Sequence, residues 1–192
     1  MQKIILASRS PRRKQLLQWA EIPFEVRSSE TAEDYPADLL PHEVAVHIAR
    51  NKALAILQDN KADNPEQAPV LAADTIVVFN DEIIGKPTDR KNAISILQKL
   101  SGKKHLVITG AVILFNKNEV AFADITEVEF HELTTEQIEF YVDNYKPFDK
   151  AGAYAIQEWI GVVGIKSING DFYNVMGLPI SRVVRELEKI KK

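Results

Sequence analysis

The sequence predicts an α/β fold in which a mixed sheet is flanked by helices, and two observations carry that prediction. Short apolar segments with strand character alternate with segments of helical period along the chain. Strand segments are also joined by short polar turns, at Asn80-Asp81 and at 116–118, which is typical of hairpins. Because hairpins add antiparallel pairs, we do not expect a purely parallel, doubly wound sheet.

The first segments predict a strand, a helix and a second strand. An apolar run at 3–7 ends in a polar stretch that begins at Ser8. Ser10 is a good N-cap and Pro11 suits the first helical position, so a helix is expected over 11–19. The later elements are expected as a strand at 23–27, an acidic loop at 28–41, a helix at 42–58, a polar spacer at 61–69, a strand at 70–79, a return segment to 87, a helix at 89–99, strands at 105–115 and 119–131, a helix at 134–144, a strand at 161–168, a glycine-containing loop and a helix from Pro179.

Length and composition restrict the class of protein. We expect one domain over residues 1–192, with two small lobes around a central cleft as the alternative. The chain has no cysteine, which excludes disulfides, thiolate catalysis and cysteine-ligated metal sites. Its net charge of −3 disfavours broad binding to nucleic acid, so a polyanion would need a local cluster of cations. No segment approaches the ~20 apolar residues that span a bilayer, so we expect a cytoplasmic protein that binds no membrane.

Arg12 and Arg13 fall in the opening turn of the first helix, where the sequence points to an anion. Each positive charge there opposes the helix dipole by roughly 0.3–1 kcal/mol, and the free N–H groups beside it suit an anion. A phosphate chain would resolve this conflict. The alternative is a pair of solvated surface arginines.

Two charged side chains fall on faces that should be buried. Asp74 shares a face of its strand with apolar residues, where a carboxylate is costly unless it is paired, hydrogen-bonded or bound to metal. The alternative is that Asp74 ends the buried part and faces water. Lys52 falls in the middle of an apolar helical stripe, so it either snorkels outward or points at an anion. That stripe is predicted to contain Val44, Ala45, Ile48, Ala49, Ala55 and Ile56.

Other candidates are weaker by pattern alone. Lys86 follows a strand end in Gly85-Lys86-Pro87, where exposed lysines are common. The acidic loop at 28–34 could supply a ligand to Mg²⁺ or Mn²⁺, although such runs are more often only solvated. Gln157 could recognise a base edge with its amide. The four histidines show no metal-ligand spacing, so we interpret them as surface or core residues.

Five ordered segments resemble the Maf family of nucleoside triphosphate pyrophosphatases. They are LASRSPRRKQLL, AADTIVV, IGKP, DKAGAYAIQ and GDFYNVMGLPIS, and together they span nearly the whole chain. The resemblance implies a fold similar to that of the inosine triphosphate pyrophosphatases, a homodimer, and a divalent metal cation such as Mg²⁺, Mn²⁺ or Co²⁺. It also implies hydrolysis of a nucleoside triphosphate to the monophosphate and pyrophosphate.

Within the family, Arg12, Thr75 and Gln157 match the branch that acts on dTTP and UTP rather than the branch that acts on 7-methyl-GTP. Lys146 and Glu158 depart from the pattern, because an acid and a glycine, respectively, are usual there. Two alternatives stay open: a pyrophosphatase for modified or other bases, and a nucleotide-binding regulator of cell division.

The resemblance and the charge pattern together suggest roles for the candidate residues. Asp74 is expected to act as general base, or as the metal-bound group that orients the attacking water. Arg13, Lys52 and Lys86 are expected to hold the triphosphate, with Ser8 adding hydrogen bonds. The resemblance alone assigns Arg12, Thr75 and Gln157 to base selection, and Glu30, which matches the family's acidic position in its loop, to a metal shared with Asp74.

Overall fold

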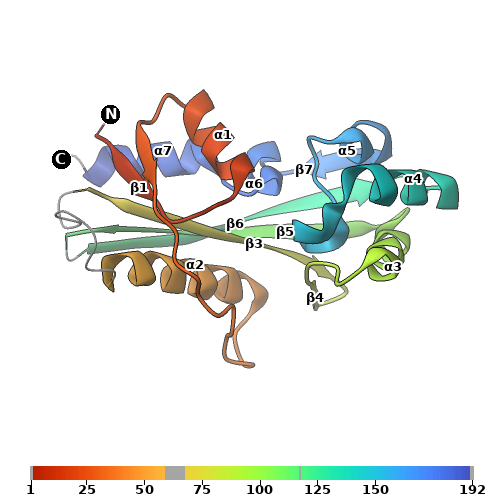
Figure 1. The fold of residues 1–192 in the computed structure, drawn as a ribbon, viewed down its shortest axis with the longest axis horizontal. Helices are drawn as coiled ribbons and strands as arrows, with labels where there is room; N and C mark the ends of the chain where they lie inside the picture. Colours follow the sequence, from red (N-terminus) through yellow and green to blue (C-terminus); the bar gives the residue numbers. More distant parts are fainter. Residues whose placement is uncertain (1, 59–67, 117, 191–192) are drawn as a thin grey trace. The chain divides into compact units, whose positions relative to one another are not determined.

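The computed structural model describes residues 2–58, 68–116 and 118–190. Its strands form a seven-stranded sheet in the order β2-β1-β3-β5-β6-β7, with β4 paired to β3 (Figure 1). The pairs of β1 with β2 and with β3 are parallel, whereas β3 with β4 and β6 with β7 are antiparallel. The predicted class, a mixed α/β sheet with helices, is therefore confirmed.

The strands and helices follow the predicted order over most of the chain. The strands are β1 (Ile4–Leu6), β2 (Phe24–Val26), β3 (Val70–Phe79), β4 (Glu82–Ile84), β5 (Lys104–Phe115), β6 (Asn118–Phe130) and β7 (Ile165–Asn169). The helices are α1 (Pro11–Trp19), α2 (Pro41–Gln58), α3 (Arg90–Leu100), α4 (Thr135–Tyr145), α5 (Trp159–Gly164), α6 (Phe172–Met176) and α7 (Ile180–Ile190), with 3-10 turns η2 (Pro147–Asp149) and η3 (Ala151–Ala153). The predicted spacer at 61–69 lies mostly outside the described residues, as does the central residue of the turn at 116–118.

The chain groups into two compact units. Unit 1 comprises Met1–Asp74, Thr109–Asp124 and Gly177–Lys192, and unit 2 comprises Thr75–Ile108 and Ile125–Met176. Strands β3, β5 and β6 each contribute one part to each unit.

In unit 1, α2 covers one face of the sheet, while α1 and α7 lie on the opposite face (Figure 1). The core between α2 and the strands is built largely from small and β-branched residues. Its members are Ile5, Ala7, Ala49, Ala53, Ile56, Val70, Ala72, Val112 and Leu114. A Cβ at Gly110 would lie 2.3 Å from the carbonyl carbon of Ala45, so glycine permits the close crossing of α2 over β5. The buried stripe of α2 includes Ala53, whereas Ala55, predicted there, is only half-buried.

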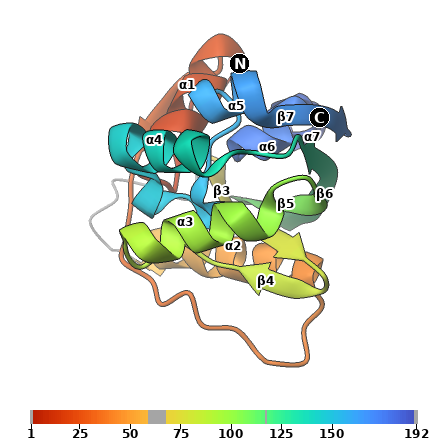
Figure 2. The ribbon, with the colours of Figure 1, turned by 90° about the vertical axis from the view of Figure 1, so that its right-hand side faces the viewer.

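In unit 2, α3 and α4 lie next to one another (Figure 2). An ion pair joins them, because Arg90 Nε donates to Asp143 Oδ1 at 2.6 Å and Nη2 donates to Oδ2 at 2.8 Å. This ion pair is exposed to water, so it helps to orient the two helices but adds little to the free energy of unfolding.

The predicted strand at 161–168 is wrong over its first half, which forms α5. The β-branched Val162 and Val163 favoured a strand, but Val162 is 81% exposed. Gly161 N and Val162 N both donate to the carbonyl of Glu158, which turns the chain into a helix. A Cβ at Gly161 would lie 1.7 Å from the carbonyl oxygen of Ile156, so the turn is tighter than any other residue allows. A second short helix, α6, occupies part of the expected loop.

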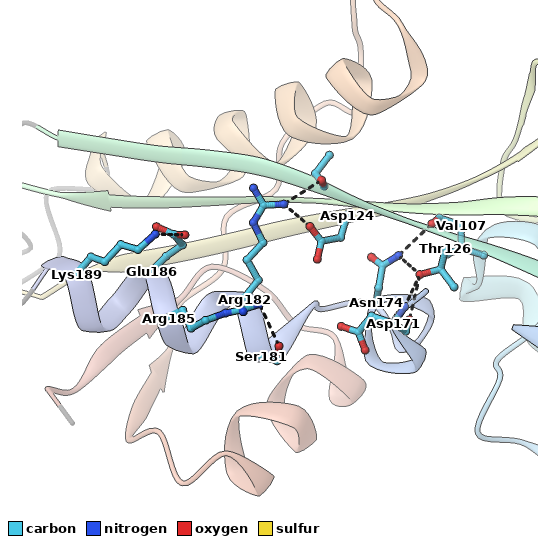
Figure 3. A network of polar contacts seen from close by, with 11 residues as sticks. Val107, Asp124, Thr126, Asp171, Asn174, Ser181, Arg182, Arg185, Glu186 and Lys189 are labelled. Carbon is cyan, nitrogen blue, oxygen red and sulfur yellow. Dashed lines mark hydrogen bonds and ion pairs between the residues drawn. The ribbon is translucent and has the colours of Figure 1, made fainter. Parts of the chain in front are cut away.

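Two separate polar networks hold the segments around α6 and α7 (Figure 3). In unit 2, the buried Asn174 donates to the carbonyl of Val107 at 3.1 Å and to Thr126 Oγ1 at 2.9 Å. In unit 1, Arg182 of α7 pairs with Asp124 and its guanidinium lies over the ring of Phe122. Both hydrogen bonds of Asn174 use its amide nitrogen, so this buried polar donor has acceptors in place.

His105 of β5 is a core residue of unit 2, one of the two interpretations open from the sequence. It is 2% exposed, stacks on Phe130, and lies with Nε2 2.7 Å from the hydroxyl of Tyr154. Its Nδ1 has no hydrogen-bond partner among the residues that the structure describes. Burial lowers the pKa of His105 to about 4, so the ring is neutral at physiological pH.

We predict that this burial makes the fold less stable in mild acid. The folded pKa of about 4 lies below the unfolded value of about 6.5, so the unfolded state takes up the proton first. The free energy of unfolding should therefore fall by on the order of 2–3 kcal/mol from this group as the pH drops from about 7 to 4. Urea unfolding of the wild type and of His105→Gln measures this. The free energy of unfolding of the variant should depend less on pH than that of the wild type. An equal dependence on pH in the two proteins would contradict the prediction.

Candidate active site

The start of α1 has the predicted capping geometry. The hydroxyl of Ser10 accepts a hydrogen bond from Arg13 N at 3.5 Å, and Pro11 occupies the first helical position. The cap directs Arg12 and Arg13 into the opening turn, as expected from the sequence. Arg12 is half-buried there.

Arg13 is a buried, fixed cation and not a solvated surface arginine. Its side chain is held on two sides, since Nε donates to the carbonyl of Gly177 at 2.8 Å and Nη1 donates to Ser8 Oγ at 3.3 Å. Ser8 Oγ also accepts from Ser10 N at 3.2 Å, which fixes the serine as well. Burial lowers the pKa of Arg13, while the negative charge of Asp74 acts in the opposite direction.

Lys52 and Asp74 form the second part of the same cluster in unit 1. Lys52 Nζ lies 2.6 Å from Asp74 Oδ1 and 2.9 Å from Glu33 Oε1. Asp74 is 8% exposed, on the face of β3 that its strand alternation predicts. Lys52 therefore points at an anion instead of snorkelling to water, and the anion in this structure is a pair of carboxylates.

The cluster is electrostatically coupled to Arg13. Asp74 and Glu33 both raise the pKa of Arg13 against the lowering that its burial imposes, and Arg12 lowers it further. Two buried or half-buried cations thus face two carboxylates, with Arg12 as an additional positive charge. Such a cluster can take up an anion, because an incoming phosphate can replace a carboxylate on Lys52.

The acidic loop contributes Glu33 to this cluster, a residue that the sequence interpretation did not select. Glu30, the predicted acid, is 92% exposed at its side chain and lies 3.9 Å from Arg9 Nη1. Arg9 in turn donates to Ser28 Oγ at 2.8 Å. A loop has no periodicity that shows which of its acids faces α2, so no signal in the spacing distinguishes Glu33 from Glu30.

Three predicted residues belong to unit 2. Thr75 directly follows Asp74 and is half-buried, Lys86 is exposed after β4, and Gln157 is exposed before α5. Their part in substrate binding stays a prediction.

The described chain holds no preformed protein cage for a metal. Over residues 2–58, 68–116 and 118–190, no group of three or more His, Cys, Asp or Glu side chains could hold an ion. Asp74 and Glu33 still offer two hard oxygen ligands around one point, Lys52 Nζ. That donor set fits Mg²⁺ or Mn²⁺, provided that phosphate oxygens and water complete the shell.

No helix in the described part of the chain combines the length and apolar character needed to cross a membrane.

Comparison with known proteins finds relatives over nearly the whole chain. A dTTP/UTP pyrophosphatase of Cytophaga hutchinsonii is 50% identical over 97% of this chain and 84% of its own length. Proteins of the same name are 44% identical in Bacteroides thetaiotaomicron and 47% identical in Bacillus cereus, each over 98% of this chain and 96% of the relative.

Among solved structures, the Staphylococcus aureus Ham1 protein is similar over 67% of this chain and 71% of that chain, with a TM-score of 0.44 and 13% identity. The family model described as Maf-like protein matches residues 3–190. With a match of that extent, and with relatives at 44–50% identity over nearly the whole chain, the chain belongs to the family of Maf-like proteins.

Proposed function

We propose that this protein hydrolyses dTTP and UTP to the nucleoside monophosphate and pyrophosphate, and so removes unwanted nucleotides from the cellular pool. The observation that carries the proposal is the charge cluster of Arg13, Lys52 and Asp74, in which Arg13 and Asp74 are buried and Lys52 is half-buried. Relatives that share about half of the sequence are named dTTP/UTP pyrophosphatases, which supports the same substrate class here.

In the proposed reaction, Arg13 and Lys52 bind the triphosphate. Phosphoryl chemistry of this kind depends mostly on positioning and on neutralising charge, and both cations are held in place before substrate arrives. Arg13 is suited to a fixed contact because its guanidinium is already oriented by Gly177 and Ser8. Ser8 and the N-terminus of α1 would add hydrogen bonds to phosphate oxygens.

Asp74 is the proposed base. Its carboxylate would orient a water molecule toward the α-phosphorus and accept its proton, while pyrophosphate leaves with the electron pair of the broken P–O bond. A carboxylate that is 8% exposed and already hydrogen-bonded to Lys52 has little freedom to move, which favours this role.

A divalent cation, when bound, would neutralise phosphate charge and lower the pKa of a coordinated water. We propose that Asp74 is one of its ligands. The family resemblance suggests Glu30 as the second ligand. The position of Glu33, whose Oε1 lies 2.9 Å from Lys52 Nζ, suggests Glu33 instead. The geometry favours Glu33.

The remaining assignments rest on the resemblance. We propose Lys86 as a further triphosphate ligand and Arg12, Thr75 and Gln157 as residues that select the base. A homodimer is proposed on the same ground. The net charge of −3 and the lengths of the apolar segments are the grounds for proposing a cytoplasmic protein that binds neither nucleic acid nor membranes.

We predict that a nucleotide panel with metal titration will give pyrophosphate release from dTTP and UTP. Their kcat/KM should exceed those of CTP, ITP and 7-methyl-GTP by at least about tenfold, since a site built around base hydrogen bonds discriminates strongly. A preference for ITP or 7-methyl-GTP would instead indicate a pyrophosphatase for other bases. Nucleotide binding without metal-dependent release of pyrophosphate would indicate a nucleotide-binding regulator.

We predict that Glu33→Gln and Glu30→Gln, a matched pair in one loop, differ in metal dependence. Loss of the Glu33 carboxylate should raise the Mg²⁺ concentration for half-maximal activity by about tenfold or more, the size expected for one lost metal ligand or its support. The exposed Glu30 should change it little. Metal titrations of dTTP hydrolysis measure both, and the reverse pattern would assign the metal to Glu30.

A further inference from the structure

Gln157 occupies a tight turn whose two ends are fixed. Glu158 N donates to the carbonyl of Ala155 at 3.1 Å, which closes a four-residue turn from Ala155 to Glu158. Ile156 in this turn is buried, at 4% exposure, whereas Gln157 is exposed. The side chain of Gln157 therefore stands out from a turn that is anchored by its neighbour.

A single buried phenol ties both ends of that turn. The hydroxyl of Tyr141, on α4, accepts a hydrogen bond from Ala155 N at 3.1 Å and donates to the carboxylate of Glu158. Tyr141 is fully buried, at 0% exposure. Because one oxygen serves both residues, the main chain at Ala155 and the side chain of Glu158 are held relative to the same fixed point, and a shift of either residue costs a hydrogen bond.

Lys150 balances the charge of Glu158 from the other side. Its Nζ lies 3.6 Å from Glu158 Oε1 and 2.7 Å from Asp149 Oδ1, and the residue is 7% exposed. A carboxylate beside buried aromatic surface would be costly without such a cation. The main chain of Glu158 also accepts from Gly161 N at 2.9 Å, so the same residue connects the turn to α5.

We propose that Tyr141, Glu158 and Lys150 form a brace that fixes the direction of Gln157 and thereby sets the preference for uracil and thymine over cytosine. The inference rests on the proposed function, in which Gln157 contacts the base. Uracil and thymine present an acceptor at O4 where cytosine presents an N4 donor, so an amide that recognises them must keep its oxygen and nitrogen in one orientation. The three brace residues are positioning residues and contact no substrate.

A double-mutant cycle between Tyr141→Phe and Gln157→Ala tests the brace with purified full-length protein. Tyr141→Phe removes only the hydroxyl. We expect KM for UTP to rise about tenfold and the preference for UTP over CTP to fall by a similar factor, the size expected for a lost buried hydrogen bond, while kcat changes less than about threefold. In the Gln157→Ala background the same change should have no further effect on KM or on the UTP preference.

Two further variants separate positioning from folding. Asp143→Asn breaks the exposed ion pair between α4 and α3, so it should leave KM and base preference unchanged. Glu158→Gln keeps an acceptor for Tyr141 but loses the charge that faces Lys150, and should lower the UTP preference in the same direction. This variant carries the test if Tyr141→Phe does not fold, as judged by thermal melting.

The possible failures are distinct. If Gln157→Ala leaves the UTP preference intact, the base contact in the proposed function is wrong and the brace has no role. If Gln157→Ala abolishes the preference but the Tyr141 and Gln157 effects add independently, the base contact stands and the brace is overturned. Equal loss of activity on UTP and CTP in Tyr141→Phe would also overturn it.

Discussion

The architecture of unit 1 depends on balancing positive charge that is withdrawn from water. Arg13, which is buried, and Lys52, which is half-buried, come from two different helices, and both need anions close by. The carboxylates of Asp74 and Glu33 form ion pairs with Lys52, and their negative charges also raise the pKa of Arg13. The pair of Lys52 with Asp74 is largely shielded from water, whereas Glu33 reaches Lys52 from the exposed side, so Asp74 is the partner that Lys52 depends on most.

This constraint is also what suits the cluster to chemistry. A hydrophobic substitution would often be as stable as a buried ion pair, so stability alone gives little reason to keep one. A pre-oriented guanidinium and ammonium beside a fixed carboxylate would supply what hydrolysis of a phosphoanhydride needs, which is charge neutralisation and a positioned base. The Gly177 carbonyl and the Ser8 hydroxyl orient Arg13 without adding any net charge.

Much of this cluster could be predicted because helices and strands have fixed periods. Alternation along β3 put Asp74 on a buried face, and the helical stripe of α2 put Lys52 among apolar residues. The Ser10 cap with Pro11 gave the start of α1, and with it the place of Arg13. Each of these inferences needed only local geometry.

The parts that could not be predicted depend on contacts between distant segments. Glu33 lies in a loop without a period, so only its contact with Lys52 identifies it. The carbonyl of Gly177 is a backbone group, which no residue pattern marks as a partner of Arg13. Likewise, the close approach of Gly161 to Ile156 turned a β-branched segment into α5, because packing overrides local propensity.

Replacing Asp74 with Asn tests whether this carboxylate activates the attacking water, since Asn keeps the shape of the side chain and an oxygen that can accept from Lys52. The measurement is steady-state dTTP hydrolysis by Asp74→Asn and the wild type, with thermal melting of both to confirm folding. We expect a fall in kcat of at least about 100-fold in a folded protein. Turnover near the wild-type rate would contradict it.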